Sequence, residues 1–312
     1  MKLLVTGGHG FVGSRVLAAL QQAGLTAAGS VRQAPSGATA YLAIGCLNGQ
    51  TDWSTATKGV DCVVHTAARV HMVKDSAADS LAEFRKVNVQ GTLNLARQAA
   101  NVGVRRLVFI SSVKVHGEIT ALGAPFSADD VLAPLDAYGI SKREAEQGLR
   151  DMAINTGMEV VIIRPPLVYG PGVKANFQAM MHWLSRGIPL PLGAIHNQRS
   201  LVALDNLVDL IVTCTHHPAA ANQSFLVSDG EDLSTTQLLR RMGQAMGRPA
   251  RLIPVPPALL QAGAALLGKP ELAQRLCGSL QVDTTKTRHL LGWKPPMSVD
   301  EGLRRAAQGF SA

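Results

Sequence analysis

The first 165 residues alternate between short, continuously apolar runs and longer stretches with the apolar spacing of a helix. The apolar runs lie at 3–5, 25–31, 61–67, 106–111 and 158–163, and the helix-like stretches at 11–23, 84–102 and 141–156. Strands without polar alternation, separated by helices, are typical of a parallel sheet covered on both faces. We therefore predict an α/β protein built on a doubly wound parallel sheet, which binds ligands at the carboxyl ends of its strands.

The pattern changes after Tyr169-Gly170-Pro171-Gly172, where proline and glycine become frequent. A short strand is predicted at 225–227, and Ser234-Thr235-Thr236-Gln237 reads as a capping box that opens a helix. Apolar helices follow. We predict that residues 1–170 with about 200–222 form a dinucleotide-binding domain. Residues from about 171 to 199, with 223–312, would form a smaller, interleaved α/β lobe.

The composition narrows the range of partners. The 312 residues carry a formal net charge of +8, and 46% of them are hydrophobic, enough for a sizeable core. The basic residues are scattered and no interleaved aromatic pattern accompanies them, so we expect no nucleic-acid partner. An anionic, phosphate-bearing substrate fits the positive charge.

The cysteines and the hydrophobic stretches indicate a cytoplasmic protein. Cys46, Cys62, Cys214 and Cys277 match no metal or redox spacing, so reduced thiols and no metal site are expected. Met1 leads directly into a strand, so no signal peptide is expected. The apolar stretch at 258–267 is too short to span a bilayer, which predicts a core or surface helix and no membrane span.

A glycine-rich loop, Gly7-x-x-Gly10-x-x-Gly13, follows the first predicted strand and opens the first predicted helix. Gly7 and Gly10 permit a tight turn and close approach of the backbone to a phosphate, and Gly13 lets the helix pack on the strand. The helix N-terminus then faces negative charge. We predict a dinucleotide site here, although such turns also simply connect strands to helices.

No acidic residue stands at the end of the second strand, which reads Gly29-Ser30-Val31-Arg32. An acidic side chain in this place usually binds the ribose diol of NAD. Arg32, assisted by Ser30, would instead bind a 2′-phosphate, whereas the alternative is a solvated surface arginine. We predict NADP(H) as the preferred cofactor and NAD(H) as the alternative.

Tyr138 and Lys142 lie four residues apart, so they share one face of a helix. An ammonium near a phenol favours the phenolate, which makes Tyr138 a candidate proton donor or acceptor. This spacing often occurs by chance, but here it accompanies the glycine loop and Ser111-Ser112 at a predicted strand end. The combination predicts hydride transfer at a carbon–oxygen centre.

Seven blocks in order along the chain carry a family resemblance. They read TGGHGFVG at 6–13, HTAA at 65–68, VNVQGTLNL at 87–95, FISSVKVHG at 109–117, YGISK at 138–142, RPPLVYGPG at 164–172 and RSLVALDNLVD at 199–209. Through them nearly the whole chain resembles the extended short-chain dehydrogenase/reductase family, in its branch of nucleotide-sugar epimerases, dehydratases and reductases. The resemblance implies a Rossmann-type sheet and an NAD(P)-dependent enzyme with a UDP-sugar substrate.

The resemblance also implies roles for individual residues. Ser112 would hydrogen-bond the reacting oxygen, Tyr138 would be the acid/base, and Lys142 would tune Tyr138 and contact the nicotinamide ribose. Together with Arg32, the expected cofactor contacts are Gly7, Gly10, Phe11, Val12, Ala67, Ala68, Asn88, Ser111, Tyr138, Lys142 and Pro165. The expected substrate contacts are Ser112, Lys114, His116, Tyr138, Asn176 and Arg199, of which Arg199 has the fork geometry that pairs with phosphate.

Three departures from the family pattern affect the assignment. Gly45-Cys46-Leu47 replaces Gly-Asp-Leu at the expected adenine contact. Val115-His116-Gly117 replaces Val-Tyr-Gly, so that His116 either faces the substrate or packs in a loop. The late Arg-x-Gly-Asp of typical UDP-glucose 4-epimerases is absent near 279–283, where Arg275 is a candidate substitute.

The blocks at 111–118, 170–177 and 225–235 bear a closer likeness to bacterial proteins encoded with O-antigen genes. From this likeness we predict an NADPH-dependent reductase of the C4 ketone of a UDP-4-keto-6-deoxy-N-acetylhexosamine, in surface-polysaccharide biosynthesis. One alternative is a 4-epimerase of UDP-hexoses or UDP-N-acetylhexosamines that retains NAD. A second is a non-catalytic dinucleotide-sensing protein of the same fold. Family likeness also favours a homodimer through paired helices.

Overall fold

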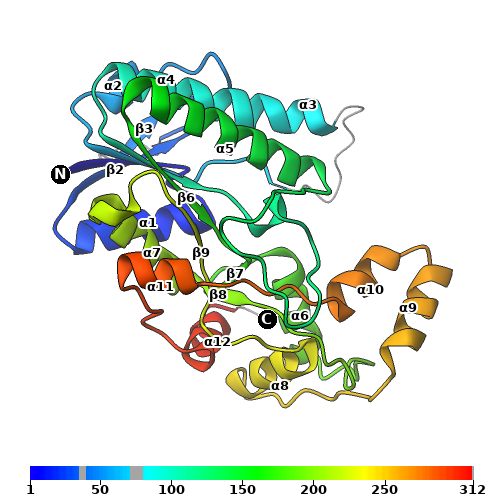
Figure 1. Cartoon of the computed structure of the whole chain (residues 1–312). Coiled ribbons are helices and arrows are strands. Elements are labelled where there is room, and N and C mark those ends of the chain that lie inside the picture. Colours follow the sequence, from blue (N-terminus) through cyan, green and yellow to red (C-terminus); the bar gives the residue numbers. More distant parts are fainter. Residues whose placement is uncertain (35–39, 71–79, 311–312) are drawn as a thin grey trace.

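A seven-stranded parallel sheet lies at the centre of the first lobe in the computed structural model, which describes residues 1–34, 40–70 and 80–310 (Figure 1). Within the described residues the strand order is β3-β2-β1-β4-β5-β6-β9. The strands are β1 (Lys2–Thr6), β2 (Thr26–Val31), β3 (Tyr41–Ala43), β4 (Cys62–His65), β5 (Arg106–Ile110), β6 (Glu159–Arg164) and β9 (Ser224–Leu226). The predicted doubly wound parallel sheet is confirmed.

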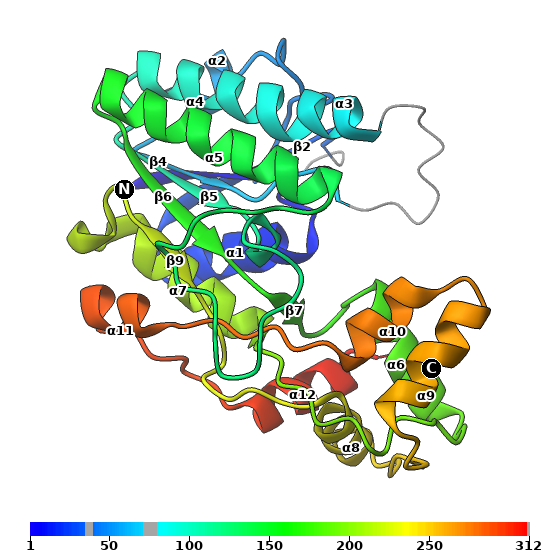
Figure 2. The same ribbon diagram turned by 45° about the vertical axis from the view of Figure 1, so that its right-hand side comes forward.

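Helices cover both faces of this sheet, as Figures 1 and 2 show. On one face lie α1 (Phe11–Gln22) and α7 (Leu204–His216), with α11 (Thr285–Leu291) beyond them. On the other lie α2 (Ser54–Thr57), α3 (Ser80–Phe84), α4 (Thr92–Asn101) and α5 (Ala137–Thr156), with a π-helical turn, η1 (Arg85–Gly91), between α3 and α4. Two apolar cores separate the layers, one on each side, because both faces of these strands carry apolar side chains.

The second lobe is built around a small parallel sheet of β7 (Leu167–Tyr169) and β8 (Leu201–Ala203). Its helices are α6 (Ala175–Ser185), α8 (Thr235–Ala245), α9 (Pro257–Leu266), α10 (Pro270–Cys277) and α12 (Val299–Gln308). Short 3₁₀ helices occur at Val113–Val115 (η2) and Pro218–Ala220 (η3). The predicted capping box at the start of α8 is confirmed, because Ser234 and Gln237 bond each other's backbone.

The predicted division into two lobes stays a prediction, but one of its boundaries moves. Residues from 223 onward were assigned to the second lobe, yet β9 pairs with β6 in the large sheet, with Ile163 opposite Phe225. The sheet of the first lobe therefore extends at least to Leu226. The sequence predicts the strand at 225–227, but so short a pattern does not indicate which sheet the strand joins.

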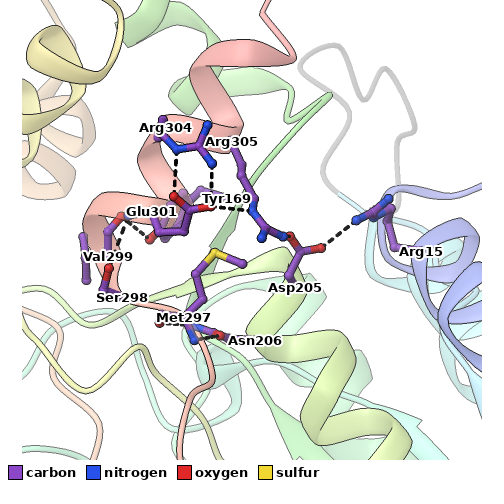
Figure 3. Close-up of polar contacts among 10 residues, drawn as sticks. All are labelled: Arg15, Tyr169, Asp205, Asn206, Met297, Ser298, Val299, Glu301, Arg304 and Arg305. Carbon is purple, nitrogen blue, oxygen red and sulfur yellow. Dashed lines mark hydrogen bonds and ion pairs between the residues drawn. The ribbon is translucent and has the colours of Figure 1, made fainter. Parts of the chain in front are cut away.

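A chain of ion pairs joins α1, α7 and α12 (Figure 3). Asp205 at the start of α7 accepts from Arg15 of α1 at 2.8 Å and from Arg305 of α12 at 2.7 Å. Glu301 binds Arg304 and Arg305 from one turn earlier in α12. A surface groove with a volume of about 750 Å³ lies beside these residues, between α1, α7 and 296–305. None of the predicted catalytic, cofactor or substrate residues lines it.

Candidate active site

The glycine loop has the conformation that a close-packed phosphate site requires. Gly7 has φ of +68°, which favours glycine, and the Gly10 amide donates to the Gly7 carbonyl at 2.7 Å. A Cβ on Gly13 would lie 2.3 Å from the carbonyl oxygen of Gly7, so only glycine fits. Gly10 precedes α1 without a side-chain cap. Phe11 and Val12, both half-buried, open α1, and their free N–H groups are available to an anion.

The end of β2 lies beside this loop. The Gly8 amide donates to the Ser30 carbonyl at 3.0 Å. Ser30 is fully buried, and its hydroxyl has no partner among the described residues. Arg32 follows the strand and is exposed to solvent. The structure thus places an arginine, without a carboxylate at 29–34, where the adenosine ribose of a bound dinucleotide is expected.

The end of β4 is pinned to its neighbours by side-chain hydrogen bonds. The Thr6 hydroxyl accepts from the Ala67 amide at 3.2 Å, and half-buried Ala68 follows. The buried Asn88 side chain bonds the backbone of Arg69 through both its oxygen and its nitrogen, and also donates to the Ser141 hydroxyl at 3.0 Å. Asn88 therefore holds the strand end against α5. Its direct contact with a cofactor stays a prediction.

Ser112 and Tyr138 are brought together, as predicted. Ser112 follows β5 and caps η2, where its hydroxyl accepts from the Lys114 amide at 3.2 Å. The same hydroxyl lies close enough to the Tyr138 side chain to lower the pKa of that phenol. The helix α5 begins at Ala137, earlier than the predicted residue 141, because Asp136 caps it by accepting from the Gly139 amide at 2.6 Å. Tyr138 and Lys142 consequently both lie in α5.

Burial dominates the proton affinities of these groups. It raises the pKa of Tyr138, and Asp136 adds to this effect, whereas the Ser112 hydroxyl opposes it. Burial lowers the pKa of Lys142 to about 7, which Glu146 partly counteracts. The Lys142 amine lies 2.8 Å from the Ile110 carbonyl and 4.4 Å from the centre of the Phe109 ring. The predicted phenolate is therefore not favoured by the protein alone, because burial and Asp136 raise the pKa of Tyr138 and only Ser112 opposes them.

The Ser111 side chain belongs to a buried polar network with Glu146 and Arg164. Its hydroxyl donates to Oε1 of Glu146 at 2.5 Å, and Glu146 forms a buried ion pair with Arg164 at 2.6 Å. Pro165 follows Arg164, and its carbonyl accepts from the Val113 amide at 3.0 Å. The sequence predictions missed Glu146 and Arg164. The available signals were a glutamate four residues after Lys142 and a charged residue ending an apolar strand.

His116 is packed within the protein. Its Nε2 lies 3.0 Å from Nη1 of Arg164, and its ring stacks on Phe126 with centroids 5.3 Å apart. Burial and then Arg164 lower its pKa to about 4, so the ring is neutral at pH 7. Nδ1 has no partner among the described residues. Of the two alternatives for His116, the packed loop residue agrees better with these contacts, and a substrate contact stays a prediction.

The predicted substrate contacts lie on several elements around the second lobe. The Lys114 amine pairs with Glu118 at 2.7 Å and with Asp136. The Arg199 guanidinium donates to the carbonyls of Arg275 and Gly278, at 3.2 and 3.0 Å, and its burial lowers its pKa. Asn176 is exposed in the first turn of α6. The structure anchors Arg199 to α10 but records no contact that joins Asn176 to it.

The cysteine thiols and the Arg275 side chain form no contact with Ser112, Tyr138 or Lys142 among the described residues. Cys46, Cys62, Cys214 and Cys277 are free thiols. The predicted substitute Arg275 pairs with Glu271 at 3.6 Å on an exposed face of α10. In the part of the chain that the structure describes, no helix is both long and apolar enough to cross a membrane.

Comparison with known proteins identifies relatives along nearly the whole chain. A model of the NAD dependent epimerase/dehydratase family matches residues 3–228. A UDP-glucose 4-epimerase of Vibrio cholerae is 48% identical over 311 residues, which cover 99% of this chain and 95% of that protein. An N-acetyl-α-D-glucosaminyl-diphospho-ditrans,octacis-undecaprenol 4-epimerase of Escherichia coli O157:H7 is 28% identical over 98% of this chain and 94% of that protein.

Solved structures show the same architecture. A short-chain dehydrogenase/reductase superfamily protein from Agrobacterium tumefaciens with bound NAD is 25% identical and superposes with a TM-score of 0.78, over 99% of this chain and 97% of that one. The UDP-N-acetylglucosamine 4-epimerase from Bacillus cereus has a TM-score of 0.80 at 19% identity, over 99% and 98% of the two chains.

Proposed function

The chain belongs to the NAD dependent epimerase/dehydratase family, and on this basis we propose that it interconverts the C4 epimers of a UDP-hexose or UDP-N-acetylhexosamine. The 48% identity to a UDP-glucose 4-epimerase over almost the full length of both proteins supports this choice. The reductase predicted from sequence becomes the second candidate, because this relative favours the epimerase.

The observation that carries the proposal is the proximity of the Ser112 hydroxyl to the buried Tyr138 phenol, whose pKa it lowers, with Lys142 one turn further along α5. A sugar hydroxyl beside this pair would give its proton to Tyr138, and Ser112 would hold the sugar oxygen. Tyr138 would return the proton when the opposite epimer forms. A protein that only sensed a dinucleotide would not need this arrangement.

The residues present fit a nicotinamide dinucleotide. Gly7, Gly10 and the uncapped start of α1 would hold its pyrophosphate. Gly13 brings the helix close to this turn, because a Cβ there would meet the Gly7 carbonyl. Ala67, Ala68 and the backbone after Arg164 would line the rest of the groove. When bound, the cofactor supplies a hydride acceptor and donor.

The charge of Lys142 would change with pH near neutrality. With a pKa of about 7, the amine takes up or releases a proton near neutral pH. In its ammonium form it would stabilise a Tyr138 phenolate, offsetting the burial that raises the pKa of Tyr138. Lys142 is therefore proposed to tune Tyr138 from within the same helix.

The diphosphate of the substrate would be bound from the second lobe. Arg199 is held by two carbonyls at the end of α10 through a single nitrogen, Nη1. Its remaining donors suit a phosphate oxygen. Asn176 and Lys114 would add contacts to the substrate from α6 and η2.

The second candidate is the NADPH-dependent reductase of a UDP-4-keto-6-deoxy-N-acetylhexosamine. The specific observation in its favour is the exposed Arg32 at the end of β2, with no acid to bind a ribose diol. A reductase exchanges its cofactor and consumes it, whereas an epimerase regenerates it within each turnover.

Product analysis by NMR separates the two. Purified protein is incubated with UDP-glucose or UDP-N-acetylglucosamine, with and without added NAD, and in parallel with NADPH and the 4-keto sugar. We expect the galacto epimers to form with no net change in absorbance at 340 nm. Stoichiometric loss of NADPH with the keto sugar, and no epimerisation, would transfer the assignment to the reductase.

A further inference from the structure

The helix α9 exposes an apolar face. None of its residues is buried. Leu259 is 64% exposed and Leu266 90%, and Leu267 directly after the helix is 77% exposed. Leu259, Ala262 and Leu266 recur at the spacing that places side chains on one helix face. A helix face directed to water normally carries polar side chains, and Gln261 is the single polar residue within α9.

The position of α9 makes this face accessible. In Figures 1 and 2, α9 and α10 form a pair that projects from the second lobe, away from the seven-stranded sheet. The inner side of the pair is attached to that lobe, where Leu260, Leu276 and Cys277 pack on the core and Thr235 donates to the Leu276 carbonyl. Leu272 of α10, which is 44% exposed, adds to the apolar surface.

Positive charge flanks the apolar segment at both ends. Residues 252–268 contain no charged side chain. Arg248 and Arg251 precede the segment, Lys269 follows it, and all three are exposed. No ion pair found among the described residues includes any of them, whereas the nearby acid Glu271 is paired with Arg275.

We propose that α9 and its flanking cations dock the protein on the surface of an anionic lipid bilayer. A short apolar helix face bordered by basic residues has the chemistry of an interfacial helix. Leu259 and Leu266 would enter the boundary between headgroups and acyl chains. Arg251 and Lys269 would meet anionic headgroups.

A bilayer suits this surface better than a protein partner. Protein interfaces concentrate aromatic and arginine anchors in a complementary patch, and 252–268 contains neither kind of residue. With ten residues, α9 is too short to cross the hydrocarbon core, so it would lie in the plane of the surface. The proposal does not depend on the reaction that the protein catalyses.

Co-sedimentation with vesicles tests the proposal. The purified full chain is mixed with vesicles of phosphatidylglycerol and phosphatidylcholine in equal parts, or of phosphatidylcholine alone. We expect binding to the anionic vesicles that weakens as salt is added. The double variant Leu259→Gln, Leu266→Gln should bind the anionic vesicles with an affinity at least about tenfold lower than that of the wild type. Replacing Arg251 and Lys269 by Gln should cost roughly fivefold for each cation.

The matched control is Ile154→Gln, which removes an aliphatic side chain that is 84% exposed on α5, remote from α9. It should bind like the wild type. Wild type that stays in the supernatant with anionic vesicles, or a double leucine variant that binds as well as wild type, would overturn the proposal. Equal binding to the neutral vesicles would also overturn it. Self-association that the leucine variant abolishes, without vesicle binding, would assign the face to a second copy of the chain.

Discussion

Glu146 and Arg164 form a buried ion pair one turn beyond Lys142, on the face of α5 that carries Tyr138. Oε2 of Glu146 lies 2.6 Å from Nη2 of Arg164, and Oε1 lies 3.0 Å from Nε. The same carboxylate accepts from Ser111 at the end of β5. Since Glu146 follows Lys142 by one turn of α5, the pair fixes the helix that carries Tyr138 to the strand ends that carry Ser112.

Removing the charge of Glu146 should destabilise the protein strongly. Glu146→Gln leaves the Arg164 guanidinium buried without a counterion, which typically costs about 3–5 kcal/mol. Urea unfolding measures the difference. The control is Glu301→Gln, whose partners Arg304 and Arg305 lie on the surface of α12, and little change is expected there. If both variants unfold at the wild-type midpoint, the ion pair does not have this role.

Tyr138→Phe should keep cofactor binding and remove most of the turnover. The variant loses only the hydroxyl that would carry the proton, and such groups contribute about 10²–10⁴-fold. Initial rates on the confirmed substrate, with cofactor titrated by fluorescence, give both quantities. Tyr41→Phe removes the same hydroxyl from a ring packed against His9 and serves as control. A Tyr138→Phe rate within threefold of wild type would refute the acid/base role.

His116 should make the protein sensitive to mild acid. Its pKa is about 4 in the folded protein, against an ordinary value of 6.5. Between these two pH values the unfolded chain binds the proton more readily, so stability is full above pH 6.5 and falls as the pH drops toward 4. The loss reaches about 3 kcal/mol at the lower end, at 1.36 kcal/mol per pKa unit.

The measurement is the unfolding free energy at several pH values, for wild type and His116→Gln. The variant should show a shallower decline across the window. His196→Gln, at an exposed histidine, should keep the wild-type slope. Identical slopes for wild type and His116→Gln would contradict the prediction.

Arg32→Ala should distinguish the two forms of the cofactor. If Arg32 binds a 2′-phosphate, its loss should weaken NADPH by about ten- to 150-fold, corresponding to roughly 1.5–3 kcal/mol, and leave NADH unchanged. Dissociation constants for both cofactors test this expectation. Arg15→Ala in α1, which loses the pair with Asp205, should change neither. Equal weakening of both cofactors by Arg32→Ala would exclude a 2′-phosphate contact.

The sequence was sufficient to predict those parts of the fold that depend on neighbouring residues in the chain. Continuous apolar runs predicted the parallel strands, and the glycine spacing predicted the turn whose close approach Gly13 requires. The four-residue spacing placed Tyr138 and Lys142 on one helix. The cap at Asp136, which sets where that helix starts, is a further local signal in the sequence.

The remaining features depend on contacts between distant segments. Arg164 meets Glu146 from a different element, and only the folded chain shows that His116 lies against this arginine. The pKa of Lys142 likewise depends on how deeply β5 and α5 bury the amine. Residue type and spacing identify such groups as candidates, but they do not determine depth or partners.

The single helix α5 has a geometric consequence for how this site tolerates change. Asp136, Tyr138, Lys142 and Glu146 are spaced along one rigid rod, with the cap at one end and the ion pair two to three turns later. Each residue added to a helix advances its rotation by about 100°. One residue inserted between Lys142 and Glu146 would put the anchor out of phase with the chemistry, although every side chain would still be present. Substitutions at the other positions of this stretch keep the four side chains in phase, whereas the insertion or deletion of a single residue does not.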